Sequence, residues 1–226
     1  DHLLEIGPGK GAMTSLLLEK CESLTAIEID KDLIRFLKKA YGDRKNFNLI
    51  EKDILLYNPK ELVRVNKLIG NIPYNISTPI IEWIIENKSS FDEIFLMLQK
   101  EFGERCVAQP NTKSYGRLSI FVQCFFDVSV IREVDKSSFD PSPKVQSIFL
   151  KLIPKVSDMT PNSILMKNLS TLTREAFSKR RKLITNSLKS FFTEEDLVNL
   201  GIERKSRPEN LSVETYIKLA KSIQGG

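Results

Sequence analysis

The stretch Gly70-Asn71-Ile72-Pro73-Tyr74-Asn75-Ile76-Ser77-Thr78-Pro79 holds residue types suited to chemistry on a planar ring that carries an amine. The Asn71 side-chain oxygen and the Ile72 carbonyl can accept from the two N–H groups of such an amine, because the residue before Pro73 is held extended. Those two bonds would free the lone pair of a poor nucleophile such as the adenine amine. Tyr74 can stack on the base, which is worth about 1–3 kcal/mol. An ordinary Asn/Pro turn with a half-buried tyrosine explains the same four residues equally well.

The neighbouring elements place this stretch at the end of a strand. Residues 65–69 are typical of a short strand, and a helix is expected to follow, with Thr78 as N-cap and Pro79 at the first helical position. In open α/β sheets, ligands bind at the carboxyl ends of the strands. The sequence therefore predicts a binding site at Asn71-Ile72-Pro73-Tyr74.

Strand and helix patterns alternate along the first two thirds of the chain. Such alternation predicts a parallel, doubly wound sheet. The helix at 12–20 is expected to turn Met13, Leu16 and Leu17 inward. Strands are predicted at 3–6, 24–29, 47–50, 94–98, 128–133 and 145–152, and further helices at 32–40, 100–108 and 118–126.

Two kinds of residue suggest a nucleotide-like ligand. The turn Gly7-Pro8-Gly9-Lys10-Gly11 lets the backbone approach a ligand at a helix N-terminus. Glu28 lies 21 residues after Gly7, where a carboxylate can accept from both ribose hydroxyls. Asp53, after the third strand, could accept from an adenine amine or simply cap a turn. Because Gly7-x-Gly9-x-x-Ala12 also satisfies the dinucleotide fingerprint, an NAD enzyme is an alternative.

Charge is distributed unevenly over the 226 residues, whose net charge is +5. Residues 1–150 carry 20 Lys/Arg and 21 Asp/Glu, whereas residues 151–226 carry 14 and 8. A basic module attached to a neutral domain points to a polyanionic substrate, although a basic surface can also serve solubility alone.

Several classes of protein are disfavoured. No apolar run approaches the roughly 20 residues of a membrane-spanning helix. Three dispersed Cys and the single His2 favour a reducing compartment and disfavour a metal site or Ser-His and Cys-His catalysis. Because the chain opens at Asp1 with a strand already in progress, we expect an N-terminal segment to be missing, so targeting signals cannot be judged.

The last third is expected to be helical. A polar break with two prolines at 154–161 predicts a boundary between domains 1–154 and 155–226. Lys179-Arg180-Arg181-Lys182 opens the second predicted helix, and we interpret this run as contacting RNA phosphates. Helices are predicted at 164–177, 179–192, 194–200 with Thr193 as cap, and 212–223.

Together these stretches closely resemble the class I AdoMet-dependent methyltransferases, and more narrowly the ribosomal RNA adenine dimethyltransferases of the kasugamycin-sensitivity type. The resemblance covers nearly all of the chain. The family's N-terminal segment is absent from this sequence. It is carried by Leu4-Glu5-Ile6-Gly7-Pro8-Gly9, Ala26-Ile27-Glu28-Ile29-Asp30, Asn71-Ile72-Pro73-Tyr74-Asn75-Ile76-Ser77-Thr78, Gln99-Lys100-Glu101, Tyr115-Gly116-Arg117-Leu118-Ser119 and Phe139-Asp140-Pro141-Ser142-Pro143-Lys144-Val145.

The resemblance implies a Rossmann-like, mostly parallel sheet whose last strand is antiparallel, followed by a small all-helical C-terminal domain. It implies that S-adenosyl-L-methionine (AdoMet) is the cofactor. Gly7 and Gly9 would lie against its methionine part, Glu28 would bind its ribose and Asp53 its adenine. Asn71 would touch both the cofactor and the target amine.

Catalytic roles fall to Asn71, Ile72, Pro73 and Tyr74, with Phe139 on the opposite face of the base. Phe139 lies in a loop that prolines stiffen. Without the resemblance, we would interpret it as an ordinary hydrophobic residue that fills space in the core.

The same resemblance implies that the protein would dimethylate the N6 amine of two adjacent adenines near the 3′ end of small-subunit ribosomal RNA. It would act in ribosome biogenesis on the pre-30S particle, as a cytoplasmic monomer without membrane contact. Arg180, Arg181 and Lys182 resemble the small-subunit family more than the macrolide-resistance methylases. Such a large-subunit methylase, a non-catalytic nucleic-acid-binding factor of the same fold and a nicotinamide oxidoreductase are the alternatives.

Overall fold

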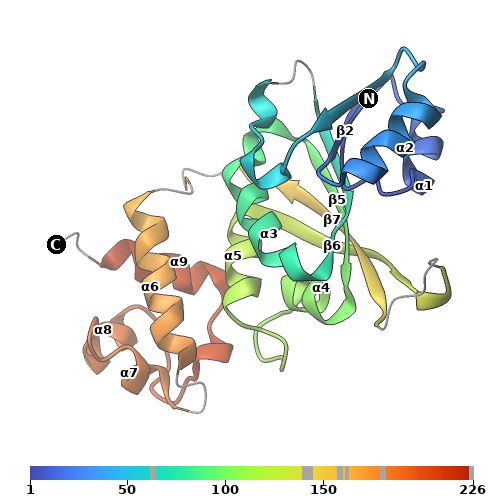
Figure 1. The fold of residues 1–226 in the computed structure, drawn as a ribbon. Helices are drawn as coiled ribbons and strands as arrows, with labels where there is room; N and C mark the ends of the chain where they lie inside the picture. The colour runs from blue at the N-terminus through green and yellow to red at the C-terminus, as the bar shows by residue number, and fades with distance from the viewer. Residues whose placement is uncertain (62–64, 139–144, 157–159, 161–162, 179–181, 224–226) are drawn as a thin grey trace. The chain divides into compact units, whose positions relative to one another are not determined.

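A computed structural model describes residues 1–61, 65–138, 145–156, 160, 163–178 and 182–223. By their contacts, the residues of the chain form two compact units (Figure 1). The sheet unit comprises Asp1–Gly103 and Asp127–Pro154, and the helical unit comprises Glu104–Phe126 and Lys155–Gly226. One limit of these units coincides with the boundary expected after residue 154. Residues 104–126, which the sequence pattern placed with the sheet, belong to the helical unit by their contacts.

The sheet unit is built on seven strands in the order β3-β2-β1-β4-β5-β7-β6. The first five are mutually parallel, and β7 is antiparallel to β5, so the doubly wound, mostly parallel fold is confirmed. The strands are β1 (His2–Ile6), β2 (Ser23–Glu28), β3 (Phe47–Glu51), β4 (Lys67–Asn71), β5 (Glu93–Gln99), β6 (Phe126–Val134) and β7 (Ser147–Pro154).

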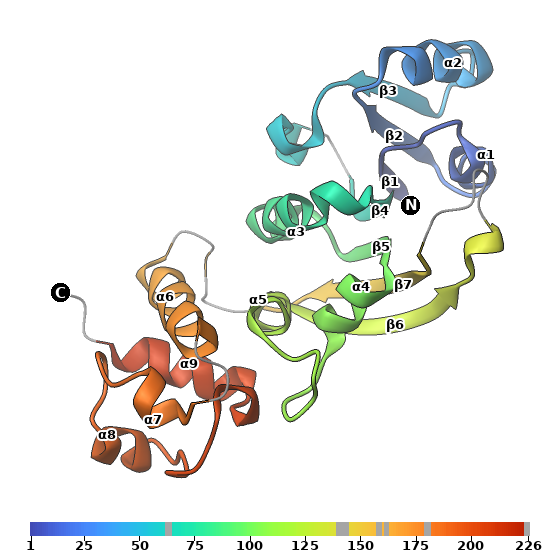
Figure 2. The same ribbon diagram turned by 60° about the horizontal axis from the view of Figure 1, so that its bottom comes forward.

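Helices cover both faces of this sheet. α1 (Ala12–Leu18) and α2 (Lys31–Tyr41) lie on one side, and α3 (Ser77–Glu86) lies on the other (Figure 2). Coverage on both faces explains why the inner strands are rich in apolar residues. Their fully buried side chains form the core and include Leu4, Leu24, Leu68, Ile94, Leu96 and Leu98.

The segment around Asn71 differs from the expectation at both ends. β4 runs from Lys67 to Asn71 rather than over 65–69, so Asn71 is the last residue of the strand. α3 begins at Ser77 with Ile76 at the N-cap, so the predicted cap at Thr78 is wrong. Pro79 is the third helical residue, which is tolerated because the first N–H groups of a helix have no intrahelical partner.

The inward face of α1 was also predicted wrongly. Its buried residues are Thr14 and Leu18, whereas Leu16 is 62% exposed. The reason is a polar contact beneath the helix, because the Thr14 hydroxyl donates to the buried Glu5 carboxylate of β1.

The helical unit contains α5 (Arg117–Phe125), α6 (Ile164–Ser178), α7 (Ile184–Ser187), α8 (Glu194–Asn199) and α9 (Val213–Ser222), with the last residues of α4 (Lys100–Val107). Thr193 caps α8 by accepting from the Asp196 N–H, which confirms that cap. The helix predicted over 179–192 is wrong in its described part, where α7 spans four residues. The Ile184 N–H donates to the Ser206 carbonyl 2.8 Å away, so α7 begins there.

Of the basic run at 179–182, the structure describes Lys182. Lys182 is exposed in the helical unit, whereas Arg180 and Arg181 lie outside the described residues, as does Phe139. Within the described part of the chain, no helix is both long enough and apolar enough to cross a membrane.

Candidate functional site

The glycine turn follows β1 and has the backbone geometry that glycine favours. Gly7, Gly9 and Gly11 have φ angles of 61°, 59° and 79°. A Cβ atom added to Gly9 would meet nothing within 4 Å, so the turn presents open backbone. A Cβ on Gly7 would lie 3.9 Å from the carbonyl oxygen of Asn71. The fold therefore brings the turn and the Asn71 segment together.

Glu5 is a buried carboxylate near the glycine turn that the sequence analysis did not consider as a candidate site residue. Its side chain is fully buried in β1, and its Oε2 accepts from the Thr14 hydroxyl at 2.7 Å. Its Oε1 is buried without a hydrogen-bond partner among the described residues. Burial raises the pKa of Glu5 to about 7, although the Thr14 bond opposes that shift. A charged residue in an apolar strand, two positions before Gly7, was the available signal.

Glu28 ends β2 in a fixed orientation. It is almost fully buried, and its Oε1 accepts from the backbone N–H groups of Ile29 at 2.8 Å and Asp30 at 3.0 Å. Two backbone bonds hold the carboxylate at the carboxyl edge of the sheet, and no ion pair to Glu28 is found among the described residues. That placement suits a neutral ligand with paired hydroxyls.

Asp53 caps a turn after β3. Its Oδ1 accepts from the Leu55 N–H at 3.0 Å, at the start of the 3₁₀ turn η1 (Ile54–Leu56). The turn-capping role considered from the sequence is therefore present. A second role toward adenine stays a prediction.

Asn71 and Ile72 present the two expected acceptors. Asn71 is exposed at the end of β4, and Ile72 is 1% exposed, with its N–H donating to the Met97 carbonyl at 3.0 Å. Pro73 has φ −56° and ψ 135°. In the part of the chain that the structure describes, no group donates to the Ile72 carbonyl. This carbonyl therefore has no competing donor among the described residues.

Tyr74 is held at two points while its ring remains accessible. The side chain is 39% exposed. Its hydroxyl lies 3.2 Å from Oγ of Ser147, the first residue of β7. Its carbonyl accepts from the Ser77 hydroxyl at 3.2 Å. Ser147 is a second residue that the sequence analysis missed, because nothing local links positions 73 residues apart.

The fold gathers most of the predicted sheet-unit residues at one edge. The glycine turn, Glu28, Asp53 and Asn71 follow or end four strands that are adjacent and parallel in the order β3-β2-β1-β4. AdoMet offers an ammonium, a ribose diol and an adenine amine. The unpartnered oxygen of Glu5, the oriented carboxylate of Glu28 and the open backbone at Gly9 fit such a molecule.

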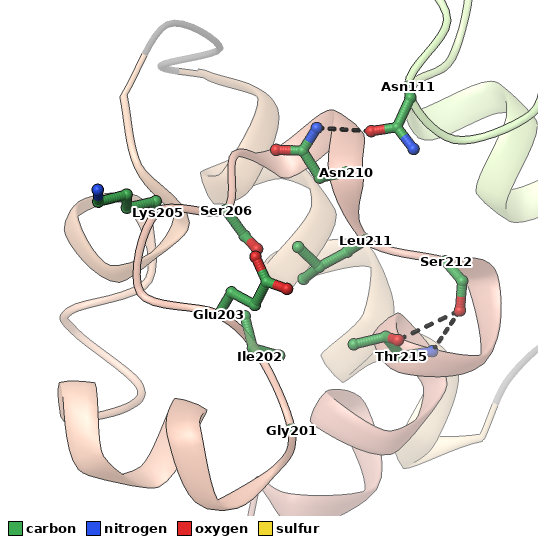
Figure 3. Close-up of a pocket in the computed structure, with 10 residues that line it drawn as sticks. All are labelled: Asn111, Gly201, Ile202, Glu203, Lys205, Ser206, Asn210, Leu211, Ser212 and Thr215. Atoms are coloured by element: carbon green, nitrogen blue, oxygen red, sulfur yellow. Dashed lines mark hydrogen bonds between the residues drawn. The ribbon is translucent and has the colours of Figure 1, made fainter.

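A separate polar pocket of about 570 Å³ lies wholly within the helical unit (Figure 3). Its wall includes Asn111, Glu203, Lys205 and Asn210, and the Asn210 amide donates to Asn111 Oδ1 at 2.7 Å. None of the residues predicted for AdoMet or adenine lines it, so it is distinct from the edge of the sheet.

The strand order, the glycine turn, Glu28 at the end of β2 and Asp53 after β3 define a class I methyltransferase. A dimethyladenosine transferase from Plasmodium falciparum is 31% identical with a TM-score of 0.80, covering 97% of this chain and 88% of that chain. The 23S rRNA methyltransferase ErmE shares the fold at 23% identity and a TM-score of 0.73, covering 98% of this chain and 90% of that one.

Proteins related in sequence identify the family within this class. The ribosomal RNA small subunit methyltransferase A of Legionella pneumophila (strain Corby) is 41% identical over 224 residues, which are 99% of this chain and 87% of the relative. The model of the family described as ribosomal RNA adenine dimethylase matches residues 1–225. The chain belongs to the ribosomal RNA adenine dimethylase family. Its activity as an AdoMet-dependent rRNA adenine dimethyltransferase is thereby confirmed, and the nicotinamide alternative is wrong.

Proposed function

We propose that this enzyme dimethylates the N6 amines of two adjacent adenines near the 3′ end of small-subunit ribosomal RNA, on the pre-30S particle. It acts as a monomer in the cytoplasm. The observation that carries this proposal is the closeness of Gly7 to Asn71, because a Cβ atom added to Gly7 would lie 3.9 Å from the Asn71 carbonyl oxygen. That closeness puts a cofactor turn beside the amine acceptors. The identity to small-subunit methyltransferases supports the choice of ribosomal subunit.

Residues at the carboxyl edge of the sheet would hold the cofactor. Gly7 and Gly9 would face its methionine part, Glu28 would accept from the ribose hydroxyls and Asp53 would accept from the adenine amine. Glu5 accepts from the ammonium group, because a buried carboxylate oxygen without a partner is costly unless a donor reaches it. When bound, AdoMet supplies a methyl group on a positively charged sulfur.

The chain's own contribution is orientation and polarisation of the target amine. Asn71 Oδ1 and the Ile72 carbonyl accept its two N–H groups, and Pro73 keeps that carbonyl in place. Tyr74 stacks on one face of the base, and Phe139 covers the other. Attack needs no general base, because the amine becomes acidic only after it gains the methyl group. The target adenine must leave any stack to reach this edge.

RNA affinity comes from the helical unit. Lys182 is exposed, and with Arg180 and Arg181 it forms a basic run that contacts phosphates. The excess of positive charge over residues 151–226 supports this role.

The direct test is transfer of labelled methyl from AdoMet to unmethylated small and large ribosomal subunits, followed by nucleoside analysis. We expect N6,N6-dimethyladenosine in small-subunit RNA. Label confined to large-subunit RNA would favour the macrolide-resistance type. Binding to small subunits without any transfer, at saturating AdoMet, would favour a non-catalytic factor.

A further inference from the structure

We propose that Ser147 is a positioning residue for methyl transfer, whose hydroxyl holds the Tyr74 ring in the orientation that receives the target base. This inference rests on the proposed stacking role of Tyr74 and assigns a second residue to that role. Ser147 does not touch the base, the cofactor or the reacting amine.

The contact joins an accessible ring to a buried anchor. The Tyr74 hydroxyl and Ser147 Oγ are 3.2 Å apart, and either atom can donate. Ser147 is 2% exposed, whereas Tyr74 is 39% exposed. A hydrogen bond shielded from water on the serine side competes less with solvent than an exposed one. The ring edge is therefore tethered while the rest of the ring stays open to a ligand.

The antiparallel direction of β7 puts Ser147 within reach. A strand that enters the sheet antiparallel starts at the edge where its parallel neighbours end. Ser147 accordingly pairs with Gln99, the last residue of β5, and the Lys100 N–H donates to the Gln146 carbonyl at 2.9 Å. Asn71 pairs with Met97 on the other side of β5. One strand thus sets the positions of both the amine acceptor and the anchor of the stacking ring.

Tethering the ring has a predictable kinetic consequence. Tyr74 is the first residue of the 3₁₀ turn η3 (Tyr74–Ile76). Without the hydrogen bond to Ser147, its ring would have to be immobilised when the base arrives, and that ordering weakens binding of the base and the transition state. With the hydroxyl already held, the ring is oriented beforehand. Loss of Ser147 should therefore lower kcat/KM for ribosomal substrate without changing AdoMet affinity.

The decisive experiment is a double-mutant cycle with Ser147→Ala, Tyr74→Phe and the double variant. Methyl transfer to unmethylated small subunits gives kcat and KM, and calorimetry gives AdoMet affinity. We expect each single change to lower kcat/KM by about threefold to tenfold, as for loss of one hydrogen bond. The double variant should match the worse single variant to within about twofold. Tyr74→Ala, which removes the ring, should be worse than any of them.

Ser23→Ala is the matched control, because Ser23 is also a strand serine bonded to a ring, with Oγ 2.8 Å from Nδ1 of His2. It should leave kcat/KM unchanged. If the losses from Ser147→Ala and Tyr74→Phe multiply, or if Ser147→Ala has no effect, the positioning role is wrong. If instead Tyr74→Ala retains full activity, the stacking role of Tyr74 in the proposed function fails. If the wild-type protein transfers no methyl group to small subunits, the proposed substrate is wrong.

Discussion

The Thr14 hydroxyl donates to Oε2 of the buried Glu5 at 2.7 Å, which ties α1 to the strand that precedes the glycine turn. The same carboxylate leaves Oε1 buried without a partner among the described residues. Burial of this oxygen without a hydrogen bond therefore lowers the stability of the ligand-free protein, and a ligand cation at this edge would remove that cost. Its pKa of about 7 makes that cost depend on pH.

Replacing Glu5 with Gln should stabilise the protein at alkaline pH. Below the ordinary pKa of 4.5, Glu5 is protonated in both folded and unfolded states, and it contributes no pH dependence. As pH rises from 4.5 to about 7, the unfolded chain loses a proton that the folded protein keeps, so wild-type stability falls. Above that range the penalty is constant, on the order of 3 kcal/mol.

Urea unfolding of wild type and Glu5→Gln at acid and alkaline pH measures this effect. The stability of the variant relative to wild type should increase with pH across this interval, and any constant effect of the amide cancels in the comparison. Exposed Glu19→Gln is the control. A pH-independent difference for Glu5→Gln would show that the pKa of Glu5 is the same in the folded and unfolded states.

AdoMet binding should release a proton from Glu5. A cation placed against the carboxylate lowers its pKa, so slightly below pH 7 binding converts a protonated group to a charged one. The calorimetric binding enthalpy should then vary with the ionisation enthalpy of the buffer. Glu5→Gln should abolish most of that variation, and equal proton release in the variant would place the source elsewhere.

Glu28→Ala should weaken AdoMet binding by more than it lowers stability. The carboxylate is oriented by the Ile29 and Asp30 N–H groups, so its loss removes a preformed acceptor for the ribose. Calorimetric titration with AdoMet and thermal unfolding without it separate the two effects. A variant with wild-type cofactor affinity would remove Glu28 from the ribose role.

Asn71→Ala should slow the chemical step with little change in RNA affinity. The amide acceptor matters most as the transition state forms, and one well-placed polar group is worth about 100-fold to 1,000-fold in rate. Single-turnover transfer at saturating AdoMet and RNA, with products separated by mass, measures both methylations. The ratio of mono- to dimethyladenosine should also change, because the singly methylated amine has one N–H left. Near-normal rates for both transfers would contradict amine polarisation.

Replacing Lys179, Arg180, Arg181 and Lys182 with Gln should weaken RNA binding and flatten its dependence on salt. Each lost phosphate contact should change the slope by about 0.7–0.9. AdoMet affinity should stay constant, which serves as the internal control. An unchanged salt slope would mean that these side chains face solvent.

The sequence by itself determined the order of strands and helices, the glycine turn and the Asn-Ile-Pro-Tyr stretch at a strand end. These features are local, because side-chain periodicity and turn residues report which face of an element is apolar and where it stops. Motif spacing then sufficed to place Glu28 at the end of one strand and Asp53 after the next. Family resemblance supplied the cofactor and the substrate class.

Only the tertiary structure decided which side chains meet across the fold. The direction of β7 brings Ser147 to Tyr74, and the packing of α1 on β1 turns Thr14 rather than Leu16 inward. In the described part of the helix predicted over 179–192, only the short α7 forms, because the Ile184 N–H bonds to Ser206, a partner distant in the chain. Such pairings depend on strand order and on competition for hydrogen bonds, which no local periodicity encodes.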